Sequence, residues 1–112
     1  MIEEIDTNLR NKNDIPDGRN TFRIMSMKKN EKLYIFSLSY DGEKTGEQVF
    51  FSSNIGPLLK VLGCKESKPG IYVLDTEVVI GASFTATVFR EASKKDANKI
   101  YQNMKDFDEV PF

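Results

Sequence analysis

The sequence predicts a small all-β domain of five strands with one short helix between the third and fourth strands. Three observations lead to this prediction. Several stretches alternate apolar and polar residues or are dense in β-branched and aromatic residues, turn signals separate them, and a single segment has helical spacing. A chain of 112 residues has room for one domain of this kind.

The first half of the chain carries three strand patterns in succession. Residues 1–20 are polar and lack a sustained period, and Ile15-Pro16-Asp17-Gly18 is a turn signal, so we expect an irregular lead-in to a domain at 21–105. A polar run from Lys28 to Lys32 and a turn opened by Asp41-Gly42 separate the strands. We predict strands at Thr21–Lys29, Leu33–Tyr40 and Glu47–Ser53.

A helical period replaces the strand pattern after residue 53. Asn54 or Gly56 is the expected cap, Pro57 suits the first turn, and Gly63 suits the position just past the helix end. The apolar residues between them fall on one side of the helix. They are Ile55, Leu58, Leu59 and Leu62. We expect this short helix to cover one end of the strands.

The second half of the chain returns to strand patterns. We expect a loop from Lys65 to Gly70 and a turn or brief helical start at Asp75–Glu77. Strands are predicted at Ile71–Val73, which is short, at Ser83–Glu91 and from Asn98 to about Lys105.

The predicted order is strand, strand, strand, helix, strand, strand. This is the element order of the OB-fold, a five-stranded Greek-key barrel with a helix between strands three and four. The order alone does not establish that the sheet closes, and a small open β-sandwich or a different barrel is the rival fold. We therefore expect an OB-fold-like barrel.

Composition excludes several kinds of site. The chain has no histidine, which removes the usual general base, and its single cysteine, Cys64, permits neither an internal disulfide nor a cysteine metal cluster. Its acidic residues form no recognisable metal-ligand motif, so we expect no enzymatic activity, cofactor or metal. We also expect a cytoplasmic, non-membrane protein, because the N-terminus is acidic and the apolar runs are short.

The charge of the chain is segregated. Three acids lie in residues 1–6 and three in residues 106–112, and neither end contains a lysine or an arginine. Residues 7–105 therefore carry 16 basic and 11 acidic side chains, a net charge of +5, although the whole chain is at −1. A basic body with acidic ends is compatible with a polyanionic partner.

The OB-fold binds oligonucleotides on strands two and three, between the loops that join strands one to two and four to five. Lysines lie in or near both loops and can neutralise phosphates, while rings on the strands can stack on bases. The alternatives are solvated turns for the lysines and core positions for the rings; of Phe50 and Phe51, which face opposite sides, one is expected to be core. The candidate nucleic-acid-binding residues are Arg23, Lys28, Lys29, Lys32, Tyr34, Phe36, Phe50, Phe89, Lys94, Lys95, Lys99 and Tyr101.

The segment 106–112 has acids followed by Val110, Pro111 and Phe112. It resembles the C-terminal tip of bacterial and phage single-stranded DNA-binding proteins, although those usually place a long linker before the tip. The resemblance implies that the tip recruits replication or recombination proteins. A ring, a carboxylate and a proline suit a peptide ligand. The candidate partner-binding residues are Asp106, Asp108, Glu109, Val110, Pro111 and Phe112.

Three further segments look like structural landmarks of a phage single-stranded DNA-binding family. They are 15–18, 55–63 and 75–81. The resemblance implies non-sequence-specific binding and protection of single-stranded DNA in phage replication or recombination. One small barrel offers a short footprint on DNA, so a homodimer or a cooperative array is an open expectation for the assembly. The alternatives are a β-barrel adaptor that binds protein and not nucleic acid, and a metal-dependent nuclease.

Overall fold

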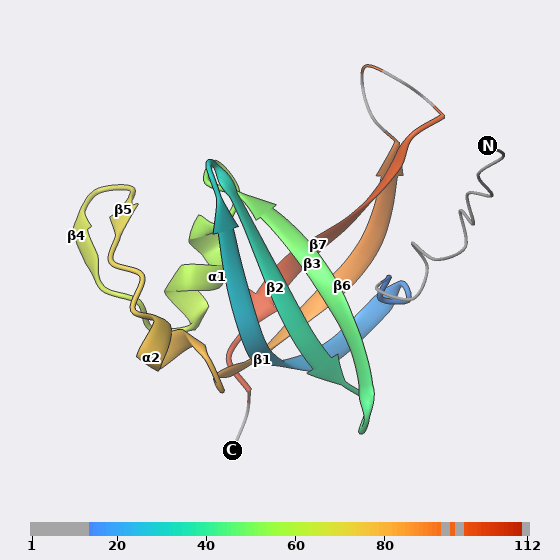
Figure 1. Cartoon of the computed structure of the whole chain (residues 1–112), viewed down its shortest axis with the longest axis horizontal. Helices are drawn as coiled ribbons and strands as arrows, with labels where there is room; N and C mark the ends of the chain where they lie inside the picture. The colour runs from blue at the N-terminus through green and yellow to red at the C-terminus, as the bar shows by residue number, and fades with distance from the viewer. Residues whose placement is uncertain (1–13, 93–94, 96–97, 111–112) are drawn as a thin grey trace, which may run out of the picture.

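The computed structural model describes residues 14–92, 95 and 98–110. Within these residues the chain is mostly strand, with two short helices (Figure 1). The elements in chain order are β1 Gly18–Asn30, β2 Leu33–Tyr40, β3 Lys44–Phe51, α1 Gly56–Val61, β4 Glu66–Lys68, β5 Ile71–Tyr72, α2 Thr76–Val79, β6 Ser83–Ala92 and β7 Ile100–Asp108.

Five strands form one antiparallel sheet in the order β3-β2-β1-β6-β7. The predicted all-β class is confirmed, as is a short helix between the third and fourth strands of this sheet. That connection also contains the β4–β5 hairpin and α2, and the hairpin replaces most of the predicted loop from Lys65 to Gly70. Figure 1 shows α1 beside the sheet, with the β4–β5 hairpin projecting beyond it.

A bulge bends β1, the central strand. Its first half pairs with β6 up to Arg23, and from Phe22 onward it pairs with β2, with a register shift between Ile24 and Ser26. An extra residue in one strand increases the local twist and bend. The bend separates the two neighbours of β1 and curls the sheet.

The two outer strands, β3 and β7, approach each other but share no backbone ladder among the described residues. Side chains bridge them: Gln102 Nε2 donates to the Glu47 carbonyl oxygen at 2.9 Å, and Gln48 Nε2 donates to that of Gln102 at 3.2 Å. The sheet is therefore not closed into a barrel by backbone hydrogen bonds, and the closed barrel expected from the sequence is not established.

The core lies on the concave face of the sheet and under α1. Phe22 packs 5.5 Å from Phe84, and Phe36 packs edge-on to Phe50 at the same centroid distance. Buried residues of the core are Ile15, Phe22, Ile24, Phe36, Leu38, Tyr40, Phe50, Ile55, Leu58, Leu59, Val79, Phe84, Ala86 and Val88. Tight packing of this kind fixes which face of each strand points inward.

The ends of α1 partly follow the prediction. Gly63 has a φ of 82° just past the helix, its N–H donates to the Lys60 carbonyl oxygen, and the Cys64 N–H donates to that of Leu59, which is a Schellman motif. The predicted cap is wrong, because Ile55 occupies the N-cap position without a side-chain hydrogen bond. The Asn54 side chain instead accepts a hydrogen bond from the Phe51 N–H.

Two strand ends differ from the sequence-based expectation. The strand β1 begins at Gly18, and Ile15, placed in the irregular lead-in, is almost fully buried. The strand β7 continues to Asp108 because Asp106, with a φ of 55°, forms a bulge opposite β6. That bulge turns Phe107 inward, where its ring lies 6.1 Å from Phe50 and 6.0 Å from Phe84.

No helix in the described part of the chain is long and apolar enough to span a bilayer.

Candidate nucleic-acid interface

The outer face of β2 and β3 is apolar at one end. Register places Leu33 opposite Phe51 and Ile35 opposite Val49, followed by the polar pair Ser37 and Glu47. Phe51 is 52% exposed and Val49 is 41% exposed, whereas the next inward-facing residue, Phe50, is buried. The apolar end of this face is therefore solvent-accessible.

A groove of about 530 Å³ lies between this apolar end and β7. Phe51 comes from β3 and Tyr101 from the start of β7, and each is 52% exposed. The remaining lining residues are Leu33, Val49, Glu91, Ala92, Gln102 and Asn103. We call this the Phe51–Tyr101 groove. It offers two accessible aromatic rings from opposite edges of the sheet.

The β1–β2 turn borders the groove on one side. A smaller cavity of about 400 Å³, lined by residues 30–33 and Phe51, joins the turn to the groove through Leu33 and Phe51. Lys28 lies on the outer face opposite Ile35, and Lys32 lines the smaller cavity. The structure thus brings these two predicted lysines close to the apolar end of β2 and β3.

The end of the β6–β7 pair borders the groove on the other side. Lys95 and Lys99 are exposed there, close in sequence to Ala92 and Tyr101 of the groove, and Lys94 lies outside the described residues. In Figure 1 the β1–β2 turn and this end of β6 and β7 both lie in the upper half of the view. Lys99 is therefore two residues along the chain from the groove residue Tyr101, while Lys28 and Lys32 lie on the side of the β1–β2 turn.

Two predicted stacking residues are core residues. Phe36 is fully buried and Phe50 is 3% exposed, so neither ring offers a face to a ligand in this structure. The physical reason is strand parity: the even-numbered residues of β2 and β3 face inward at this register. The expectation that one of Phe50 and Phe51 is core is confirmed, and the accessible ring is Phe51.

The other predicted residues lie at the margins. Tyr34 and Phe89 are half-buried, with Lys29 Nζ 5.7 Å from the centre of the Tyr34 ring and Lys105 Nζ 5.1 Å from that of Phe89. Arg23 is exposed but pairs in register with Ser39, at the opposite end of β2 from Leu33. Arg23 therefore lies away from the groove.

The sequence reasoning missed Phe51, Val49 and Leu33. A signal for them existed, because Val49 and Phe51 alternate with Gln48 and Phe50 in one strand pattern and Leu33 directly follows a basic turn. The alternation was ambiguous, however, since Val49 and Phe51 form a more apolar face than Gln48 and Phe50. The hydrogen bonds of the buried Gln48 side chain and the packing of Phe50 on Phe36 explain why the more polar face points inward.

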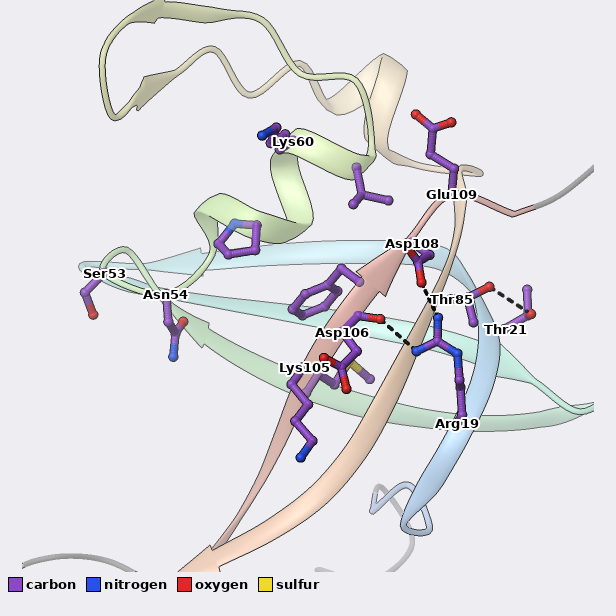
Figure 2. A pocket seen from close by; sticks show the side chains of 14 residues that line it. Arg19, Thr21, Ser53, Asn54, Lys60, Thr85, Lys105, Asp106, Asp108 and Glu109 are labelled. Atoms are coloured by element: carbon purple, nitrogen blue, oxygen red, sulfur yellow. Dashed lines mark hydrogen bonds and ion pairs between the residues drawn. The ribbon is translucent and has the colours of Figure 1, made fainter.

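The predicted partner-binding acids begin inside the domain. Figure 2 shows Arg19 donating to the Asp106 carbonyl oxygen and pairing with the Asp108 carboxylate. These residues line a second, open groove of about 1400 Å³ between α1 and β7, which Glu109 also lines. Val110 follows Glu109 and is half-buried, and Pro111 and Phe112 lie outside the described residues.

Among the described residues no group of three or more histidine, cysteine or acidic side chains is arranged to hold a metal ion. No protein-family model matches the chain, and no curated protein matches its sequence.

Proposed function

We propose that the protein binds single-stranded DNA without sequence preference, in the Phe51–Tyr101 groove. The observation that carries the proposal is the pair of half-exposed rings, Phe51 and Tyr101, in one groove between β3 and β7. Exposed aromatic rings in a groove flanked by lysines are the arrangement that serves single-stranded nucleic acid, since bases of any sequence stack on them.

The charges around the groove support the same proposal. Lys28 and Lys32 on one side, with Lys95 and Lys99 on the other, attract a phosphate backbone that crosses the groove, and counterions are released as it binds. Glu91 lies in the groove wall and repels phosphate locally, so the backbone path follows the lysines while the bases occupy the apolar centre.

An OB-fold-like barrel is the finer architecture that we propose. The sheet order β3-β2-β1-β6-β7 is the order obtained by opening a Greek-key barrel between its third and fifth strands. The Gln48–Gln102 hydrogen bonds then take the place of a backbone ladder at the seam. In this architecture the groove coincides with the usual oligonucleotide-binding face.

The family resemblance adds a biological setting to the proposal. A phage protein of this kind protects single-stranded DNA during replication or recombination and recruits partner proteins through its acidic C-terminal tip. Because Asp108 pairs with Arg19, the recruiting residues that we propose are Glu109 to Phe112.

A titration of labelled oligo-dT and a matched duplex, followed by fluorescence anisotropy at about 50 mM and about 200 mM salt, tests the proposal. We expect preference for the single strand, binding that weakens with salt, and loss of affinity in the Phe51→Ala/Tyr101→Ala double variant. Equal affinity for duplex DNA, or an unchanged double variant, would overturn the proposal.

A protein-binding adaptor is the alternative, and one observation favours it. The segment from β5 through α2 exposes four aliphatic side chains, each about half accessible: Ile71, Val73, Val78 and Ile80. Absence of any oligonucleotide binding at low salt, in a folded protein, would favour this alternative.

A further inference from the structure

The chain before β1 is held firmly at Ile15. This side chain is 1% exposed, its N–H donates to Gln102 Oε1 at 2.7 Å, and its carbonyl oxygen accepts from Arg90. Two residues later Asp17 pairs with the same arginine at 2.7 Å. The start of the described chain is therefore attached to the inner side of β6 and β7.

This anchor places the preceding residue beside the proposed DNA-binding groove. Asp14 lines a small cavity of about 240 Å³ with Val49, Tyr101 and Gln102. These last three residues also line the Phe51–Tyr101 groove. The chain upstream of Asp14 consequently begins at the groove wall, whatever path it then follows.

Residues 1–13 lie outside the described part of the chain, but their sequence and length are informative. Residues 1–6 contain three carboxylates and no basic residue, with Ile2 and Ile5 between them. The eight residues from Asp6 to Asp14 span at most about 27 Å when extended. That length covers the groove, since Val49 and Phe51 are only two strand positions apart, about 7 Å.

We propose that residues 1–6 dock in the Phe51–Tyr101 groove and compete there with nucleic acid. The carboxylates of Glu3, Glu4 and Asp6 take the place of phosphates near the flanking lysines, and the isoleucines cover the exposed rings. The competition with nucleic acid rests on the proposed function, because it requires DNA to bind in the same groove. The docking of residues 1–6 does not depend on that function.

The acids at the other end of the chain are badly placed for this role. Asp108 lies seven residues along β7 from Tyr101, roughly 20 Å away. Its carboxylate pairs with Arg19, and the chain continues beside α1 in the second groove. The charge pattern of the two ends is similar, but only the first acidic segment leaves from the Phe51–Tyr101 groove.

The decisive experiment compares two triple variants of the full chain by oligo-dT titration at about 50 mM and about 200 mM salt. Glu3→Gln/Glu4→Gln/Asp6→Asn removes the docking charges, and Glu43→Gln/Glu66→Gln/Glu77→Gln removes three exposed charges elsewhere. We expect the first variant to bind about fivefold to tenfold more tightly at low salt and the control to change less than twofold. The gain should shrink at the higher salt concentration.

Amide chemical shifts provide a readout that needs no DNA. We expect Val49, Phe51 and Tyr101 to shift between the unsubstituted chain and the first variant, and not in the control. Normal DNA binding with neither tightening nor shifts would overturn the docking and leave the proposed function intact. Shifts without any DNA binding would support the docking and overturn the proposed function.

Discussion

Gln48 and Gln102 exchange hydrogen bonds across the two edges of the sheet: Gln102 Nε2 donates to Gln48 Oε1 at 2.6 Å, and Gln48 Nε2 donates to the Gln102 carbonyl oxygen. The same Gln102 side chain accepts from the Ile15 N–H. One amide thus connects β7 to β3 and to the segment before β1.

Gln102→Ala should therefore destabilise the fold. It leaves the Ile15 N–H without its acceptor and the buried Gln48 Oε1 without its donor, at a cost of about 1–3 kcal/mol. Urea unfolding and thermal melts measure the loss. Asn103→Ala, one position along the strand on the opposite face, is the control and should change stability by less than about 0.5 kcal/mol. Equal stability of the two variants would show that the Gln102 side chain does not stabilise the contact between β3 and β7.

Phe50 and Phe51 should separate stability from binding. Phe50→Ala removes a core ring packed against Phe36 and should cost about 3–5 kcal/mol of folding free energy. Phe51→Ala removes an exposed ring, so the melting temperature should hardly change while oligo-dT binding weakens by about 1–3 kcal/mol. Loss of stability in the Phe51 variant with no loss of affinity would show that Phe51 supports the fold and does not stack on DNA.

The double variant Lys28→Glu/Lys29→Glu should weaken binding to every single-stranded sequence alike. Lys28 attracts phosphate in our proposal and Lys29 is its neighbour on β1, so the charge reversal should also lower the slope of log affinity against log salt. Lys65→Glu/Lys68→Glu makes the same charge change at the β4–β5 hairpin and should have little effect. Binding isotherms on oligo-dT and a mixed sequence test this, and an unchanged slope would remove the β1–β2 turn from the site.

Among the C-terminal residues, those up to Asp108 should contribute to stability and residues 109–112 should not. Deletion of residues 109–112 leaves β7, the Arg19–Asp108 pair and Phe107 in place, so stability should be kept and DNA affinity should change less than twofold. Deletion of residues 106–112 also removes Phe107 from the core and should lower the melting temperature by several degrees. Similar melting temperatures for the two deletions would show that Phe107 contributes nothing.

Cys64 should react slowly with iodoacetamide at pH 8. Burial raises the pKa of the Cys64 thiol, and the Asp75 carboxylate raises it further, so less reactive thiolate is present at this pH than in an exposed cysteine. Asp75→Asn should speed the reaction while still capping α2. Mass spectrometry of the alkylated protein over time gives the rates, with a short cysteine peptide as reference. A rate equal to that of the peptide would show that the pKa of the Cys64 thiol is not raised.

Local patterns in the sequence predicted the elements well. The bounds of β2, Leu33–Tyr40, agree with the prediction, and Gly63 ends α1 as expected, because strand propensity and a left-handed glycine are properties of a few adjacent residues. The β1–β2 lysines were also found in this way, since a polar run between two strand patterns marks a turn.

Contacts between residues far apart in the sequence determined the features that local patterns did not predict. The sequence by itself predicted a small, mostly β chain with a short helix after the third strand, and it showed that both ends carry acids and no basic residue. The tertiary structure decided that Gln48 and Phe50 point inward and Phe51 outward, because Gln48 satisfies its amide through Gln102, 54 residues away. It also brought Phe51 and Tyr101 into one groove. No local pattern contains such a pairing, since it arises only where two edges of a curled sheet meet.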